Sequence, residues 1–247
     1  MTATRVLAGN PGPMTLEGTN TWVLGAPEGR SVVLDPGPDE IGHLRRVLAA
    51  ATAGGRELAA VVVTHHHLDH AEGLGTLTAL SGVPPTRVGE GDVVAVDGLT
   101  LRVLATPGHT ADSVTFLDEA EGCLYTGDTV LGRGTTVVAH PDGRLVDYLR
   151  SLQRLAGLDA RLIRPGHGPD VADVPGWIGY YREHRAARLE QIRQAVAEGA
   201  RTPGQIVAQV YAEVDRQLWP AAELTVAAAL DYLRERGQLP SAPGPGR

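Results

Sequence analysis

Short apolar runs, separated by glycine and proline, fill the first 180 residues of the chain. Residues 21–24 and 31–34 predict one β-hairpin. Residues 93–96 and 99–104 predict a second hairpin around Asp97-Gly98, a strong turn sequence. Further short strands are predicted at 58–63, 114–117, 122–126 and 161–164. The run at 58–63 is continuously apolar, which is typical of a strand buried on both faces.

Apolar side chains at helical spacing predict helices between these strands, at residues 40–53, 71–80 and 146–155. Helices inserted among short strands indicate an α/β architecture built on mixed sheets. The pattern changes near Trp177, where amphipathic helices are predicted at 181–197, 203–211 and 221–236. Thr202-Pro203 is a helix start and Gly237 a helix stop. We therefore predict an α/β domain at 1–180, a small helical domain at 181–239 and a disordered tail at 240–247.

Composition narrows the partners that the protein could have. The 247 residues carry a net charge of −7, and the basic residues are all arginine. An acidic, lysine-free chain is not a general nucleic-acid coater, because nonspecific binding depends on neutralised phosphates. Residues 182–247 hold nine arginines against eight acids, too little for a specific DNA reader. The helical domain is instead expected to form a wall of the substrate cleft or the surface of a homodimer.

Cysteine content and hydropathy restrict the cellular compartments in which the protein is expected. A single cysteine, Cys123, excludes an intrachain disulfide and a thiolate zinc cluster. The chain has no apolar run long enough to span a bilayer, and its start is too short for a signal-peptide core. These features predict a cytoplasmic protein without a membrane partner.

The histidines are unevenly distributed, with four of the nine between His65 and His70. They directly follow the predicted strand at 58–63. Side chains alternate along an extended segment, so His65 and His67 can point to one side. Asp69 and His70 lie on the turn into the next helix. Imidazole and carboxylate are the usual nitrogen and oxygen ligands of zinc. A chance surface cluster would not be expected directly after a buried strand.

Three more predicted strands end in a polar side chain close to glycine. These side chains are His109, Asp128 and His167. Loops at strand ends are where a rigid scaffold presents functional groups. Together with the first string they supply five histidines and two aspartates, which suit a dinuclear site with one shared carboxylate and open positions for water.

This set of residues, from His65 to His167, resembles the metallo-β-lactamase fold superfamily. The resemblance implies a four-layer αββα sandwich with metals at one edge. It also implies that the first metal is bound by His65, His67 and His109, and the second by Asp69, His70 and His167. Asp128 would bridge the two metals. The expected cofactor is two Zn²⁺ per chain, with Mn²⁺ or Fe²⁺ as alternatives.

A narrower resemblance covers almost the whole chain. The segments 10–21, 127–136, 165–169 and 181–185 are similar to the β-lactamase-like protein 2 group. That group implies a C-terminal winged-helix-like domain and a zinc-dependent endoribonuclease that acts on single-stranded RNA. The chain departs from the group at residues 139–144, which make a longer loop, and at Arg133, where an acid is expected.

The expected mechanism uses a metal-bound hydroxide as nucleophile, with Asp69 and Asp128 as catalytic residues. Asp69 would orient the nucleophile. Arg133, His140 and Asn20 are candidate substrate contacts, whereas His43 and His184 are expected on helix surfaces.

Other functions stay open at this point. Residues 1–181 hold 13 arginines against 21 acids, which argues against RNA. An acyl thioester is therefore the main alternative substrate, hydrolysed as by glyoxalase II or by polyketide-releasing enzymes. A β-lactamase is disfavoured by the missing signal peptide. A non-catalytic nucleic-acid-binding regulator is disfavoured by the complete set of ligands.

Overall fold

The computed structural model describes residues 2–239, so the predicted disordered tail at 240–247 lies outside the described residues. The chain divides into two compact units. The first unit comprises Met1–Thr106, Asp112–Thr136 and Gly157–Val174, and the second comprises Pro107–Ala111, Val137–Ala156 and Pro175–Arg247. The predicted boundaries, 1–180 and 181–239, stay predictions; the compact units are drawn differently, because the second one takes in two segments from the middle of the chain.

The first sheet of the first unit has the order β1-β2-β3-β4. Its strands are β1 (Thr2–Leu7), β2 (Asn20–Gly25), β3 (Arg30–Leu34) and β4 (Glu57–Val62). The predicted hairpin is confirmed as β2 and β3, which pair antiparallel, and β4 runs parallel to β3. Strand β1 was not predicted. Its side chains are exposed or half-buried, so no apolar alternation marks it, and pairing with β2 defines it.

The second sheet has the order β5-β6-β7-β8-β9. Its strands are β5 (Val93–Val96), β6 (Leu99–Ala105), β7 (Val114–Asp118), β8 (Cys123–Gly127) and β9 (Leu162–Pro165). Strands β5 to β8 form an antiparallel meander, and β9 pairs parallel with β8. All five were predicted. Both sheets are therefore mixed, as expected.

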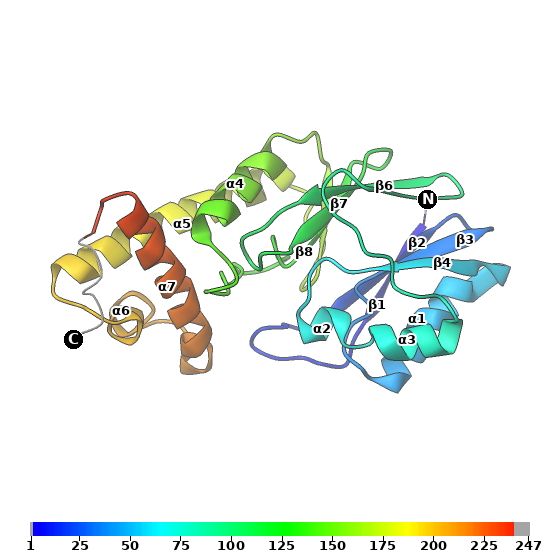
Figure 1. Cartoon of the computed structure of the whole chain (residues 1–247), viewed down its shortest axis with the longest axis horizontal. Helices are drawn as coiled ribbons and strands as arrows, with labels where there is room; N and C mark the ends of the chain where they lie inside the picture. Colours follow the sequence, from blue (N-terminus) through cyan, green and yellow to red (C-terminus); the bar gives the residue numbers. More distant parts are fainter. Residues whose placement is uncertain (1, 240–247) are drawn as a thin grey trace. The chain divides into compact units, whose positions relative to one another are not determined.

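Alternation along the strands divides the core of the first unit into two layers. Trp22 and Leu24 of β2 pack between the sheets, together with Phe116 and Tyr125 of the second sheet. Val23 points the opposite way, into a cluster closed by the helices α1 (Ile41–Thr52) and α3 (Leu74–Ser81). Both helices lie along one face of the first sheet (Figure 1). The predicted α/β class is confirmed.

One predicted helix of this unit has the wrong bounds. Residues 71–80 form parts of two helices, α2 (Leu68–Ala71) and α3, rather than one. The helical conformation is interrupted near Gly73, whose N–H donates to the carbonyl of Gly37 at 2.9 Å. The break places Asp69 and His70 on their own short helix directly after the histidine string.

The second unit is helical, and it contains α4 (Leu145–Ala156), α5 (Val174–Ala197), α6 (Pro203–Val210) and α7 (Trp219–Glu235). The start of α6 is the predicted one: Thr202 caps it and forms a capping box with Gln205. Helix α5 begins seven residues earlier than predicted, because Pro175 is tolerated in a first helical turn. Within residues 2–239, no helix is both long and apolar enough to cross a membrane.

Candidate metal centre

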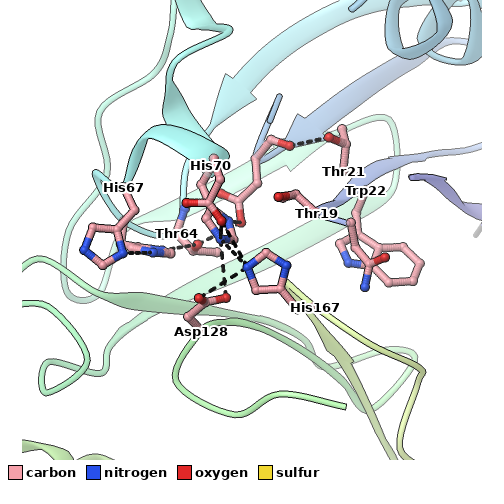
Figure 2. A network of polar contacts seen from close by, with 12 residues as sticks. Thr19, Thr21, Trp22, Thr64, His67, His70, Asp128 and His167 are labelled. Atoms are coloured by element: carbon pink, nitrogen blue, oxygen red, sulfur yellow. Dashed lines mark hydrogen bonds and ion pairs between the residues drawn. The ribbon is translucent and has the colours of Figure 1, made fainter. Parts of the chain in front are cut away.

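The predicted ligands of the first unit follow the ends of three strands. His65 to His70 come after β4, Asp128 comes after β8, and His167 comes after β9. Their side chains meet, although almost 100 residues separate His70 from His167 in the chain (Figure 2). Both of these imidazoles are buried.

Four donor groups converge on one point. The Nε2 atoms of His70 and His167 lie 3.2 Å apart. A carboxylate oxygen of Asp69 lies 3.1 Å from Nε2 of His167 and 3.5 Å from Nε2 of His70. The carboxylate of Asp128 reaches the same two nitrogens at 3.3 and 3.4 Å. Two imidazole nitrogens and two carboxylates around one point form a donor set that suits a divalent cation.

A second group of donors adjoins this point. Nε2 of His65 lies 3.2 Å from Nδ1 of His67. One ligand atom from each of His65, His70 and Asp128 also falls within 4.8 Å of the other two. His70 and Asp128 therefore belong to both groups of donors.

A buried carboxylate, Asp35, orients two of these imidazoles. It accepts a hydrogen bond from Nδ1 of His70 at 2.9 Å. It also accepts one from the Thr64 hydroxyl at 2.8 Å, and that hydroxyl lies 3.0 Å from Nδ1 of His65. With Nδ1 anchored, the Nε2 lone pairs of both rings are left for a metal.

The loop that carries His167 is fixed from the start of β2. Nδ1 of His167 lies 3.2 Å from the carbonyl oxygen of Gly18. The Asn20 amide donates to the carbonyls of Pro165 and Gly168, on either side of the histidine, at 3.1 and 2.9 Å. A Cβ atom at Gly166 would lie 2.6 Å from Asp128 Oδ1 and from His70 Cε1, so glycine keeps the centre open.

Opposite charges support one another in this cluster. Burial opposes a charge on Asp128, yet His167 and His70 outweigh burial and hold the pKa of its carboxyl well below its usual range. Burial also disfavours charged imidazoles, but Asp128 and Asp35 hold the pKa of His70 well above its ordinary value. Asp128 likewise raises the pKa of His167 to about 10 despite its burial. A cation binding here would replace protons that the cluster otherwise retains.

His109 belongs to the second unit, on the loop after β6. It is buried, and its Nδ1 lies 2.7 Å from the carbonyl oxygen of Val137. This bond leaves Nε2 as the nitrogen available to a metal. Its membership of the metal centre stays a prediction.

The three candidate substrate contacts differ in their surroundings. Asn20 is buried and holds the His167 loop, whereas Arg133 is exposed and pairs with Glu17 at 2.7 Å. His140 lies in the second unit, where its Nε2 is 3.0 Å from Asp231 of α7. Asn20 and Arg133 both line a groove of about 250 Å³, with other lining residues Arg5, Leu7, Glu17, Gly168 and Pro169. These positions do not test whether Asn20, Arg133 or His140 contacts a substrate.

The sequence analysis missed Asp35 and Thr64. Asp35 follows the buried strand β3 directly, and this is the same strand-end signal that identified Asp128 and His167. It was hidden because Asp35-Pro36-Gly37 also has the composition of an ordinary turn. The expectation that His43 lies on a helix surface is wrong: its ring is fully buried, and its Nε2 lies 3.0 Å from both Thr21 Oγ1 and the Pro36 carbonyl.

Comparison with known proteins decides the family. The sequence profile of the Metallo-beta-lactamase superfamily matches residues 14–90 and 81–167. The chain belongs to this superfamily. A second profile, the Beta-lactamase associated winged helix domain, matches residues 202–242. The resemblance, the metallo-β-lactamase fold with a C-terminal winged-helix domain, and the prediction of a metal-dependent hydrolase are all confirmed.

Individual relatives agree with this membership. A Beta-lactamase-like protein 2 homolog from Caenorhabditis elegans is 36% identical, and the match covers 85% of this chain and 76% of that protein. The crystal structure of a metallo-beta-lactamase family protein from Thermus thermophilus is 26% identical, with a TM-score of 0.76 over 95% of this chain and 94% of that one. A third protein, solved in a di-iron-bound form, is 25% identical, with a TM-score of 0.55 over 74% of this chain and 97% of its own.

Proposed function

We propose that the chain is a dinuclear metal-dependent hydrolase that cleaves phosphodiester bonds in single-stranded RNA. The observation that carries the proposal is the convergence of Nε2 of His70 and His167 with the carboxylates of Asp69 and Asp128. The closest nitrogen–oxygen distance among them is 3.1 Å. Buried charged groups are costly unless they are paired or bind a cation.

Two cations would be held by seven side chains. We assign one cation to His65, His67 and His109, and the other to Asp69, His70 and His167, with Asp128 shared. Zn²⁺ suits imidazole and carboxylate ligands best, and Mn²⁺ or Fe²⁺ would accept the same set. The di-iron form of a structural relative supports keeping iron among the candidates.

The cations would lower the pKa of a water molecule and polarise the ester under attack. The residues of the chain divide the remaining work. The Asp69 side chain is 29% exposed, compared with 11% for Asp128. Burial opposes ionisation of Asp69, but His167 and His70 lower its pKa, so its carboxylate is ready to accept a hydrogen bond. We assign Asp69 to orienting the attacking water and Asp128 to holding the centre together.

A phosphodiester is the favoured ester because the first unit offers basic groups to an anion. Arg5 and Arg133 line the groove that also includes Gly168, which follows His167. Arg133 is exposed although it pairs with Glu17. RNA is chosen among phosphodiesters because segments 10–21, 127–136, 165–169 and 181–185 resemble the β-lactamase-like protein 2 group, and that resemblance implies an endoribonuclease.

An acyl thioester is the second candidate. The same donor set can activate water toward an acyl carbon. The observation that favours it is charge: residues 1–181 hold 13 arginines against 21 acids, a balance of −8 that repels an extended polyanion.

Side-by-side turnover of the two esters tests both candidates. We would load the full chain with two zinc ions and assay an end-labelled, unstructured RNA in parallel with an acyl thioester. Asp128→Asn is the disabled variant. Asp118→Asn is the matched control, because Asp118 is a buried acid at the end of β7 that caps a turn through Glu121.

The proposal expects RNA cleavage by the wild type and by Asp118→Asn, with almost none by Asp128→Asn. Thioester turnover without RNA cleavage would replace the phosphodiester with the second candidate. Turnover of neither ester by protein that holds two metals would contradict both.

A further inference from the structure

A single peptide bond of the second unit makes hydrogen bonds to both sides. Its carbonyl, from Val137, lies 2.7 Å from Nδ1 of His109. Its N–H, from Val138, donates to the hydroxyl oxygen of Thr225 at 3.1 Å. Thr225 is on α7, within the segment that matches the winged-helix profile. One rigid peptide plane thus connects the winged-helix domain to a predicted metal ligand.

We propose that Thr225 is a positioning residue for His109 and acts through the peptide group between Val137 and Val138. The inference rests on the proposed function, in which His109 is a ligand. The Val137 carbonyl selects the His109 tautomer with its proton on Nδ1 and directs Nε2 away. Thr225 holds the peptide plane, so it sets the direction of that carbonyl.

Burial makes this relay effective. His109 is 4% exposed, Val138 is fully buried, and Thr225 is 7% exposed. Water therefore cannot easily replace either hydrogen bond, and a buried N–H left without an acceptor is costly. Hydrogen bonds at the two ends of one peptide group also strengthen each other in a low-dielectric environment.

Further contacts hold the segment from Val137 to Arg144 around the His109 loop. The N–H of Ala139 donates to the carbonyl of His109 at 3.0 Å. A Cβ atom at Gly143 would collide with the carbonyl oxygens of His109 and Gly108, so the close approach requires glycine there. The segment from Val137 to Arg144 therefore packs closely against the His109 loop.

Two further contacts join the segment from Val137 to Arg144 to α7. Nε2 of His140 lies 3.0 Å from Asp231, and Arg144 pairs with Glu235 at 3.0 Å. Both pairs are partly or largely exposed, and exposed ion pairs contribute little. The buried Thr225 bond is therefore the decisive one. This view gives His140 a structural partner in addition to its predicted substrate role.

The test compares three variants in α7 of the full chain. Thr225→Val keeps the shape of the side chain and removes the acceptor. Thr225→Ser restores an acceptor. Val226→Ala is the matched control, because Val226 is the fully buried neighbour, and its truncation weakens packing without touching the peptide.

The readouts are metal stoichiometry and affinity, measured by chelator competition, and the visible spectrum of the Co²⁺-loaded protein. Loss of an outer hydrogen-bond partner of a ligand typically weakens metal binding ~10–100-fold. We expect Thr225→Val to bind one of its two metals about tenfold more weakly and to alter the Co²⁺ spectrum. Thr225→Ser should restore both readouts toward the wild type, and Val226→Ala should leave both unchanged.

Two results would overturn the inference. Wild-type affinity and spectrum in Thr225→Val would show that the bond does not position the ligand. Equal effects of Thr225→Val and Val226→Ala would show a general loss of packing. If the valine variant does not fold, Thr225→Ala compared with Thr225→Ser asks the same question.

His109→Ala separates this inference from the proposed function. Loss of one metal in His109→Ala, with Thr225→Val unaffected, would reject the positioning role and leave the ligand assignment standing. Two metals held at full affinity by His109→Ala would reject the ligand assignment itself.

Discussion

The two units anchor their candidate metal-ligand histidines by different means. In the first unit, the side chain of Asp35 binds Nδ1 of His70 and, through the Thr64 hydroxyl, faces His65. In the second unit, a backbone carbonyl binds Nδ1 of His109, and a helix hydroxyl holds the same peptide. Both devices select the Nδ1-protonated tautomer, but only the first adds a negative charge.

That difference has consequences for function and for prediction. A carboxylate beside an imidazole strengthens the ligand and couples it to other charges in the cluster, whereas a carbonyl only directs it. A carboxylate is also encoded by one residue, so a single substitution can remove it. A backbone carbonyl can be moved only through the residues that hold its peptide plane. The following experiments test this difference between the two anchors and are ordered by decreasing expected effect.

His70→Ala should be the most damaging change in the first unit. His70 faces Asp35, Asp69, Asp128 and His167, so its loss removes a predicted ligand and leaves three carboxylates without their imidazole partner. We expect one metal to be lost and turnover to fall by about 10³-fold, which corresponds to ~4 kcal/mol of transition-state stabilisation. Metal analysis and turnover of the active ester measure this. Retention of both metals would contradict the central position of His70.

Asp35→Asn tests the carboxylate anchor directly. Asparagine keeps the shape, but its NH₂ group would face the Nδ1–H of His70 and favour the other tautomer. The proton would then lie on Nε2, where the metal should bind. We expect metal affinity to fall ~10–100-fold, as measured by chelator competition. Asp118→Asn, at another buried acid, is the control and should bind metal normally. Equal affinities in both variants would show that Asp35 is only a packing residue.

The sequence predicted the features whose signals are local in the chain and missed those whose signals are not. The predicted ligands between His65 and His70 could be identified because they are close together in the chain and directly follow an apolar strand. The hairpins were readable because Asp97-Gly98 and the alternating apolar positions are local signals. Strand β1 was not, since its exposed side chains lack alternation.

The anchors were harder to predict than the ligands. Asp35 had a weak signal, an acid at the end of a buried strand, which a turn-like context obscured. The bond between Val137 and His109 had none, because any residue supplies a carbonyl. Thr225 lies 87 residues from Val138 in the chain, and only the tertiary fold brings them together. Sequence alone therefore identifies groups that perform chemistry better than groups that orient them.

Removal of metal tests whether both units respond to the centre. If His109 is a ligand, metal should slow amide hydrogen exchange in residues 107–111 as well as in residues 64–71. Ligand present at 100 times its Kd stabilises the bound state by ~2.7 kcal/mol, or about 100-fold in exchange from states that must release it. Hydrogen-exchange mass spectrometry with and without a chelator measures this. Protection confined to residues 64–71 would exclude His109 from the ligand set.

The smallest expected effect concerns a histidine with no proposed role at the metals. His184 of α5 was expected on a helix surface but is half-buried, and its Nδ1 has no hydrogen-bond partner within residues 2–239. Burial, together with the charges of Arg185 and Arg188, lowers its pKa to about 4. The unfolded chain binds this proton near pH 6.5, so between pH 6.5 and 4 unfolding takes up a proton. His184 therefore makes the fold less stable as the pH falls through this window.

His184→Gln should remove that part of the acid sensitivity. We expect the stability lost by the wild type between pH 7.5 and 5 to exceed that lost by the variant by roughly 1 kcal/mol, after allowing for solvent screening of a half-exposed ring. Urea unfolding of both proteins at each pH gives the difference, and the titration of the metal ligands cancels because both proteins share it. Between pH 7.5 and 9 the two stability curves should run parallel, since the ring is neutral in both states there. Parallel curves down to pH 5 would mean that His184 is charged as readily in the fold as in the unfolded chain. That outcome would remove the contrast with His70, where carboxylates more than offset burial, whereas the charges of Arg185 and Arg188 add to the effect of burial on His184.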